Sequence, residues 1–424
     1  MVSLTADDRR RLRGAEGAAL KLAMDVVCAT AEIGGAARLI DIEGAHLSES
    51  FYAGQAHQDF VDRMISLGAR VVVPTTVNPG SATLRGPQGA TADPEAVSAA
   101  RRLMRSVLRL GCRPSFTCAP YQLPGCVTQG GHVAWSESSA VVYANAVIGA
   151  RTNLHYDYED LCAALVGRVG DHGLHRDGER KASLIVDVGA VALEILRHEL
   201  GCHLLGHLVG SAVGHAIPAI IGLPAETRLD WLRALGAAAS SSGALRMFHA
   251  VGITPEAPNL NAATESQAGL PRLEVTGSDL RSAVNDLSRP GEGPLQGVYL
   301  GTPHFSLVEF DGLLHLLDGR RVRDGIACIV NTSRHNRDVL RARGLLGRLE
   351  RAGVALMVDA CTYYGLPLAG LRGRVMTNSA KWAYYAPRTH DVAIEFGTLQ
   401  DCVESAVNGE PCRADSVWHD HLWR

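Results

Sequence analysis

Short runs of β-branched and aliphatic residues, each followed at once by small or polar residues, recur through the last third of the chain. They are "LEVTG" (273–277), "GVYLGTPHFS" (297–306), "CIVNTSR" (328–334), "ALMVDAC" (355–361) and "RVMTNSAK" (374–381). Runs of this kind are typical of buried strands that end in polar turns. Because helical segments separate them, they predict an α/β sheet whose functional loops lie at the carboxyl ends of the strands.

A similar alternation runs through the first half of the chain. Thr5 and Asp8 form a capping box that predicts an early helix, and Asp93 with Pro94 marks the start of another. The pattern predicts helices at 15–30 and 93–110, buried strands at 37–42 and 69–79, a strand end at 114–121, and a helix that becomes a turn at 138–153. Residues 174–223 are expected to hold a strand at 183–188 and an apolar, histidine-rich helix.

Two turn-rich stretches, 254–272 and 288–294, are expected to be surface loops or lobe boundaries. We therefore expect several α/β lobes over residues 1–424, with possible boundaries near 170–180 and 254–294.

Composition narrows the class of partner. The chain has 424 residues, of which 46% are hydrophobic and 20% charged, as in soluble globular proteins. A net charge near −3 without a long basic run gives no reason to expect nucleic acid. Residues 204–225 carry no formal charge, but two histidines, several glycines and Pro218 favour a buried helix, a turn and a strand over a membrane span. The N-terminus does not resemble a secretory signal, so a cytoplasmic location is expected.

The ten cysteines form no CxxC pair, and most are expected to be inert, reduced thiols in the core. This group includes Cys28, Cys162, Cys202 and Cys328. Cys118 and Cys361 differ because each ends a predicted strand, where a thiolate could bind a soft metal or an iron–sulfur cluster.

The apolar helix contains "HELGCHLLGH", in which His203 and His207 lie four residues apart on one face. From His198 through Glu199 to His203, however, the spacing is one residue too long for the HExxH zinc motif. Buried, hydrogen-bonded histidines are therefore expected here.

Polar groups follow six successive strand or turn positions. They are Thr75-Thr76-x-Asn78, Thr117-Cys118-x-Pro120, Arg151-Thr152-Asn153, Thr302-Pro303-His304, Asn331-Thr332-Ser333-Arg334 and Asn378-Ser379-x-Lys381. One such group could be ordinary turn chemistry. Convergence of several on one pocket favours a functional site, in which Arg151, Arg334 and Lys381 would hold an anionic substrate. A P-loop, a dinucleotide-binding fingerprint and a G-x-S-x-G elbow are all absent from the sequence.

These segments, taken in order, resemble the large-chain part of the aconitase X family. The matching pieces are "ARLIDIEGAHLS", "VPTTVNPGS", "SFTCAPYQ", "SSAVVYANAVIGARTN", "VYLGTPHFSL", "NTSR", "VMTNSAKWAYYAP" and "FGTLQDCVESAVNGE". The resemblance implies an aconitase-like, multi-lobed α/β fold and an iron-dependent hydro-lyase. Family members remove water from cis-3-hydroxy-L-proline in bacteria or from mevalonate 5-phosphate in archaea.

The resemblance also assigns candidate residues. Cys118 and Cys361 would be ligands of iron or an iron–sulfur cluster, while Thr302 stands where many members have a third cysteine. A smaller cluster, a single iron or a loss of metal all remain open. The expected catalytic residues are His304, Lys381 and Arg151. Expected substrate-binding residues are His46, Thr75, Thr76, Asn78, Asn145, Thr152, Asn153, Ser333, Arg334, Asn378 and Ser379.

The family also has a small swivelling domain, fused or separate, whose loop is expected to carry a catalytic serine. No such loop is found in this sequence, so a two-chain enzyme is expected, with this chain as the large subunit and no membrane or nucleic-acid partner. The favoured substrate is the small zwitterion cis-3-hydroxy-L-proline. The alternatives are a phosphorylated hydroxy acid such as mevalonate 5-phosphate, and a non-catalytic chain that has lost its iron.

Overall fold

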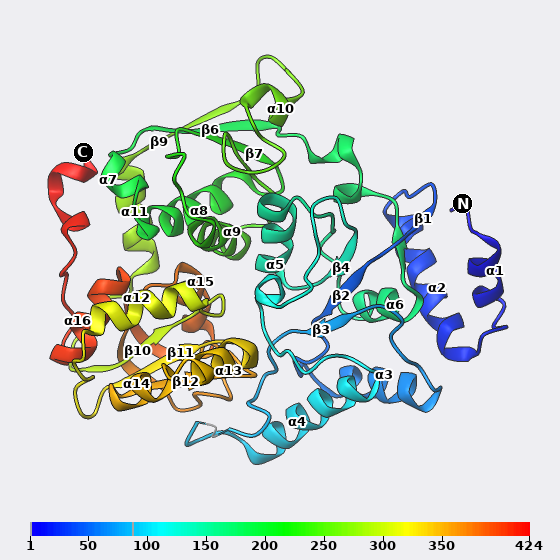
Figure 1. Cartoon of the computed structure of the whole chain (residues 1–424), viewed down its shortest axis with the longest axis horizontal. Helices are drawn as coiled ribbons and strands as arrows, with labels where there is room; N and C mark the ends of the chain where they lie inside the picture. The colour runs from blue at the N-terminus through cyan, green and yellow to red at the C-terminus, as the bar shows by residue number, and fades with distance from the viewer. Residues whose placement is uncertain (1, 87–88) are drawn as a thin grey trace.

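The computed structural model describes residues 2–86 and 89–424, and the strands within them form four sheets. Three sheets are parallel, with strand orders β3-β2-β4, β8-β7-β6-β9 and β12-β11-β10-β13-β14. Each is the centre of one α/β lobe (Figure 1). The predicted α/β architecture of several lobes is confirmed.

The first lobe, blue to cyan on the right of Figure 1, carries the three-stranded sheet. Its strands are β1 (Leu39–Asp41), β2 (Gly44–Leu47), β3 (Thr75–Val77), β4 (Val133–Trp135) and β5 (Arg168–Gly170), and β1 pairs with β5 in antiparallel orientation. Its helices are α1 (Ala6–Leu12), α2 (Ala18–Ile33), α3 (Gln55–Ser66), α4 (Pro94–Arg109), α5 (Ser138–Tyr143) and α6 (Glu159–Val166). The capping box at Thr5 and the cap at Asp93 are both present, as predicted.

Two predicted strands of this lobe are shorter or absent. Of residues 69–79 only Thr75–Val77 form a strand, and Val72 is 58% exposed, so an apolar run alone did not indicate burial. Residues 114–118 run beside β3, and the Thr117 N–H donates a hydrogen bond to the Val77 carbonyl. They do not form a strand with β3, because Phe116 has φ 39°, which is incompatible with extended backbone. Strand β2 was not predicted because "GAHL" lacks the β-branched residues that mark the other strands.

The second lobe, green in Figure 1, contains the four-stranded sheet. Its strands are β6 (Leu184–Ala190), β7 (Pro218–Ile221), β8 (His249–Ala250) and β9 (Arg272–Thr276), and its helices are α7 (Leu193–Leu196), α8 (Glu199–Val213), α9 (Leu229–Ser242), α10 (Leu260–Thr264) and α11 (Gly277–Leu287). A Cβ atom at Gly206 would lie 2.3 Å from the Leu235 carbonyl oxygen, so the glycine lets α8 and α9 pack closely. The predicted helix, turn and strand over 204–225 are confirmed, and within residues 2–86 and 89–424 no helix is both long and apolar enough to cross a bilayer.

The third lobe, yellow to red, contains a five-stranded parallel sheet. Its strands are β10 (Leu295–Leu300), β11 (Ala327–Asn331), β12 (Val354–Met357), β13 (Arg372–Thr377) and β14 (Asp391–Phe396), and its helices are α12 (Leu307–Leu317), α13 (Arg334–Ala342), α14 (Leu346–Arg351), α15 (Ala380–Tyr385) and α16 (Leu399–Asn408). Four of these strands, β10 to β13, were predicted; the predicted run 273–277 instead forms β9 of the second lobe, and the fifth strand, β14, was not predicted. One apolar cluster unites the second and third lobes, because Leu204 and Leu235 share it with Trp382 and Ile394. The chain end returns to the second lobe, where Arg281 stacks over Trp423.

A buried arginine links the first lobe to the second through hydrogen bonds and an ion pair. The Arg180 side chain, 1% exposed, donates hydrogen bonds to the carbonyl groups of Asn145, Ala150 and Leu174 and forms an ion pair with Glu256. Arg180→Met would leave these acceptors without a donor. We expect it to lower the free energy of unfolding by about 3–5 kcal/mol, measured by urea denaturation.

The control for this prediction is Arg197→Met, which removes an exposed arginine that pairs with Glu226. An exposed ion pair contributes little, so the midpoint of unfolding should stay at the wild-type value. An equal decrease in the free energy of unfolding in both variants would contradict the proposed role of Arg180 in linking the lobes.

Candidate metal centre and active site

Two thiols and an imidazole meet in the interior of the protein. Cys118 comes from the first lobe, whereas His304 and Cys361 follow strands β10 and β12 of the third. All three are buried, and their potential ligand atoms lie within 4.8 Å of one another. Among the residues that the structure describes, this is the one such group of histidine, cysteine and acidic side chains.

Local structure explains how distant segments deliver these side chains. Gly301 has φ +82°, and a Cβ atom there would lie 2.3 Å from the Asn331 carbonyl oxygen, so only glycine permits this turn before His304. The Thr362 N–H donates to the Asn331 side chain, which fixes the backbone after Cys361. A β-bridge between Gly80 and Ala360 joins the first lobe to the third beside this point.

The hydrogen bonds within the group orient its atoms. The backbone N–H of His304 lies 3.2 Å from the Cys118 Sγ, and the His304 Nε2 lies 3.5 Å from the Cys361 Sγ. The Thr117 hydroxyl is 3.0 Å from the His304 Nδ1. Because that contact occupies Nδ1, the other ring nitrogen faces the thiols.

The electrostatic surroundings distinguish the two thiols. Burial opposes ionisation of Cys118, but the hydrogen bond from Cys361, the charge of Lys381 and the His304 N–H outweigh it and lower the pKa of Cys118. Burial and the neighbouring Cys118 raise the pKa of Cys361 well above its ordinary value. Burial also lowers the pKa of His304 to about 3, so its imidazole is neutral and can act as a ligand.

A buried ion pair lies close enough to influence this group. The Lys381 Nζ is 2.5 Å from the Glu137 Oε1, and the two side chains are 3% and 6% exposed. Burial disfavours both charges, but their mutual attraction prevails, raising the pKa of Lys381 and lowering that of Glu137. The sequence analysis identified Lys381 but missed Glu137, whose side chain also caps helix α5 by accepting a hydrogen bond from the Ala140 N–H.

Thr302 lies beside the group in a hydrogen-bonded network. Its hydroxyl accepts a hydrogen bond of 3.3 Å from Asn331, and its carbonyl accepts one from Ser379. The Asn331 amide also donates to Thr362, the residue after Cys361. Across residues 2–86 and 89–424, no third cysteine joins Cys118 and Cys361. Two sulfur atoms and an imidazole nitrogen form a donor set that suits iron or another borderline-to-soft transition metal.

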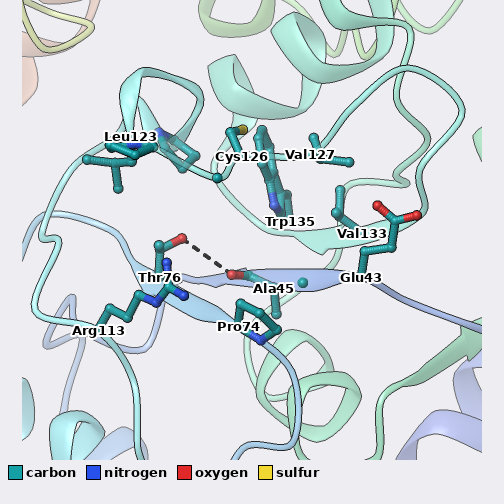
Figure 2. Close-up of a pocket in the computed structure, with 14 residues that line it drawn as sticks. Glu43, Ala45, Pro74, Thr76, Arg113, Leu123, Cys126, Val127, Val133 and Trp135 are labelled. Atoms are coloured by element: carbon teal, nitrogen blue, oxygen red, sulfur yellow. Dashed lines mark hydrogen bonds between the residues drawn. The ribbon is translucent and has the colours of Figure 1, made fainter.

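His46 is buried near Glu137, and burial lowers its pKa to about 4. Its Nδ1 lies 2.8 Å from the Thr76 hydroxyl. Thr76 in turn lines a pocket near the amino ends of β2 and β4, where Figure 2 shows its hydroxyl bonded to the Ala45 carbonyl and Arg113 and Glu43 on opposite sides. Thr76 therefore contacts both this pocket and His46.

Residues 145–153 use their polar atoms within the chain. The Asn145 amide donates to the Thr152 and Arg246 carbonyl groups, and its oxygen accepts from the Thr152 N–H. The Asn153 side-chain amide donates a hydrogen bond to the His172 carbonyl, and its oxygen accepts one from the Leu174 N–H. Arg151 pairs with Asp177 and donates to the His175 carbonyl. None of these hydrogen bonds connects residues 145–153 to Cys118, His304 or Cys361.

The remaining predicted residues lie in two places. Ser333, Arg334, Asn378 and Ser379 lie where a strand of the third lobe ends and the next helix begins, whereas Thr75 lies in β3 and Asn78 just after it. Arg334 forms a two-pronged ion pair with Asp359, and its guanidinium lies over the Phe116 ring at 5.5 Å, which links the Cys361 turn to the Cys118 segment. Ser333 and Ser379 cap helices α13 and α15, and Asn378 is 5% exposed. The hydroxyl of Thr75 donates to Val73, and the Asn78 carbonyl accepts from Ser50.

The two histidines of helix α8 and several of the other thiols lie in the interior of the protein. His203 and His207 are buried, with Glu199 and Asp286 as their respective neighbours, and neither belongs to a metal-binding group in the described chain. Burial raises the pKa values of Cys202 and Cys328 to about 12, as expected for inert core thiols.

Fold and site together define an α/β protein of several lobes with a sulfur-rich candidate metal centre where two lobes meet. The chain belongs to the aconitase X family. It matches the first domain of aconitase X over residues 1–178, the second over 182–285 and the third over 295–408. The family resemblance predicted from sequence motifs is thereby confirmed.

Named relatives include two cis-3-hydroxy-L-proline dehydratases. That of Pseudomonas aeruginosa is 39% identical, over 98% of this chain and 72% of the relative, and that of Hypocrea jecorina is 35% identical, over 96% and 69%. The phosphomevalonate dehydratase large subunit of Thermococcus kodakarensis is 31% identical, over 95% of this chain and 99% of its own. The crystal structure of Thermococcus kodakaraensis aconitase X in its holo-form matches with a TM-score of 0.86 at 30% identity, covering 96% of this chain and all of that one.

Proposed function

We propose that this chain is the large subunit of an iron-dependent hydro-lyase that removes water from cis-3-hydroxy-L-proline. The product would be an enamine or imine that becomes pyrroline-2-carboxylate. The observation that carries the proposal is the buried group of Cys118, His304 and Cys361 beside the Lys381–Glu137 ion pair. The two hydroxyproline dehydratases named above, at 39% and 35% identity, support the choice of substrate.

The donor set fits an iron ion or a small iron–sulfur cluster held by Cys118 and Cys361, with His304 as a further candidate ligand. Such a group would supply a Lewis acid for the leaving hydroxyl. Thr302, whose hydroxyl is bonded to Asn331, is a weaker candidate as a ligand for a soft metal than a thiolate would be.

The protein's own groups have separate tasks in this proposal. Lys381 supplies a fixed positive charge for the substrate carboxylate and the enolate charge that develops next to it. Glu137 keeps that lysine protonated and in place, since its carboxylate accepts a hydrogen bond from the Lys381 Nζ. His46, Thr76 and Asn78 are proposed to shape or contact the substrate. Arg151 stays a predicted catalytic residue, although its partners here are Asp177 and the His175 carbonyl.

The proton acceptor is proposed to lie on a partner chain. Relatives that this chain covers almost fully are named large subunits, which supports a small subunit as partner. We propose that this partner carries the swivelling domain and the serine that takes the proton from the substrate carbon. We also propose a cytoplasmic heterodimer that acts on a small zwitterionic substrate and binds neither nucleic acid nor membrane.

A second candidate is dehydration of a phosphorylated hydroxy acid. It is favoured by the named phosphomevalonate dehydratase large subunits, which are 27–33% identical to this chain. A chain without catalytic activity is the third candidate, since Thr302 occupies the expected cysteine position.

The test is water elimination from cis-3-hydroxy-L-proline and from mevalonate 5-phosphate, using anaerobically purified chain with and without its co-expressed small partner. Turnover of the hydroxyproline in the pair alone is the expected result. Turnover of the phosphate alone would select the second candidate. An iron-loaded pair that converts neither substrate would reject both.

Thr302 provides a separate prediction about the donor set. Thr302→Cys should increase the iron and sulfide retained per chain, because a thiolate binds soft metals more strongly than a hydroxyl group does. Thr302→Ser keeps the hydroxyl and is the matched control. Elemental analysis after anaerobic purification gives the result, and equal iron in all three proteins would contradict the prediction.

A further inference from the structure

A buried guanidinium lies behind the turn that carries His304. Arg233 is on helix α9 of the second lobe, and its side chain is 3% exposed. It donates a hydrogen bond of 2.8 Å to the His304 carbonyl and forms an ion pair with Glu309. Asp230, one helical turn earlier, lies 3.6 Å from its Nε. Its charge is therefore compensated within the protein, and one arm of the guanidinium is left for the turn.

The backbone on both sides of the His304 Cα is held by identified partners. On one side, the His304 carbonyl accepts from Arg233 and, at 3.1 Å, from the Gln122 amide. On the other, the His304 N–H donates to the Cys118 Sγ. Because both flanking peptide groups are held, the direction of the His304 ring toward Cys361 depends on these contacts.

Glu309 connects the guanidinium to the same turn by a second route. Its carboxylate accepts a hydrogen bond of 2.7 Å from the Ser306 N–H in the capping box of helix α12. Arg233 thus binds both the carbonyl of the turn and the first turn of the following helix. A lysine at this position could not make both contacts with the planar, forked geometry of an arginine.

The space beside Arg233 excludes direct contact with a substrate. The cavity there has room for about one water molecule. Its walls include Glu199, His203, Thr302, Pro303, Asn378 and Ser379. Arg233 therefore does not reach a substrate through this cavity, and its direct contact with the turn is the hydrogen bond to the His304 carbonyl.

We propose that Arg233 is a positioning residue for the metal centre, holding the His304 backbone so that its N–H and ring face the two thiols. The inference rests on the proposed function only in taking Cys118, His304 and Cys361 as a metal site. It adds the second lobe to that site, because helix α9 supplies the group that fixes the turn.

The test compares Arg233→Met and Arg233→Lys with Arg180→Lys, in the full chain co-expressed with its partner and stripped of metal by a chelator. Arg180 is an equally buried guanidinium with a carboxylate partner, but it clasps the first and second lobes and does not contact the turn. Anaerobic titration with Co²⁺, followed by thiolate-to-cobalt charge-transfer absorption, measures affinity independently of any substrate.

We expect Arg233→Met to weaken Co²⁺ binding by about 10- to 100-fold, and Arg233→Lys by less, as for residues that orient metal ligands. Arg180→Lys should leave the affinity within about twofold of wild type. If Arg233→Met does not fold, Gln122→Met removes the other donor to the same carbonyl from a half-buried position and should weaken binding in the same direction.

Three results would overturn the inference: wild-type affinity in the foldable turn variant, an equal loss in Arg180→Lys, or no thiolate absorption with Co²⁺ in the wild-type protein. Failure of hydroxyproline turnover with the expected cobalt results would instead reject the proposed substrate and leave the role of Arg233 intact.

Discussion

Replacing Cys361 by alanine should abolish iron retention and lower the rate of water elimination by about 1,000-fold. A metal that polarises a leaving oxygen contributes several kcal/mol to the transition state, and ~4 kcal/mol corresponds to this factor. Cys361 is one of two thiols in the buried group, and its sulfur also faces the His304 ring. Iron analysis and the hydroxyproline assay on the same anaerobic preparation provide the two measurements.

The matched control is Cys328→Ala, which removes a buried thiol from strand β11 of the same sheet. Cys328 packs in the apolar cluster of the third lobe and has no polar partner among the described residues. Its loss should cost about 1 kcal/mol of stability and leave iron content unchanged. A Cys361→Ala protein that keeps its iron would remove Cys361 from the ligand set.

Replacing Glu137 by leucine should destabilise the protein by about 3–5 kcal/mol, because it leaves the Lys381 charge buried without its partner. Lys381→Met should cost a comparable amount for the converse reason. The double variant Glu137→Leu/Lys381→Met removes both charges and should recover a large part of the loss. Urea unfolding of the four proteins forms a double-mutant cycle, and strictly additive single losses would show that the pair is not coupled.

The same pair gives a pH dependence with a defined sign. The pKa of Glu137 is lowered from 4.5, so its contribution is present above that value and is lost as the pH falls through the folded-state pKa. The pKa of Lys381 is raised from 10.5, so its contribution is present below that value and is lost as the pH rises through the folded-state pKa. The stability difference between wild type and the double variant should therefore be independent of pH between about 5 and 10 and change outside that range.

Local patterns predicted most of the fold and the central part of the site. Four of the five strands of the third lobe, β10 to β13, are apolar runs that end in small or polar residues, and these four form as expected. Cys118 and Cys361 were singled out because each ends such a run. Cys118 nevertheless follows an irregular segment, since Phe116 adopts a left-handed conformation that no local pattern indicated.

Groups that act through distant partners could not be predicted. Glu137 and Lys381 are 244 residues apart, and Arg233 is 71 residues from the carbonyl that it binds. Neither spacing leaves a periodic signal in the sequence. Asn145 and Asn153 illustrate the opposite difficulty: a polar residue looks the same in the sequence whether it binds a ligand or, as here, forms hydrogen bonds with the backbone.

Cys118 belongs to the first lobe, whereas His304 and Cys361 belong to the third, so the ribosome makes these candidate ligands at different times. Cys118 and His304 are 186 residues apart. At about 5–20 residues per second of synthesis, roughly 10–40 s pass between the emergence of the first thiol from the ribosome and that of the imidazole. During this interval the first lobe can fold with Cys118 lacking its later partners, so this thiol is exposed to oxidants before any metal can be captured. If this group holds iron as proposed, its full set of ligands exists only after the third lobe has been synthesised and has docked on the first.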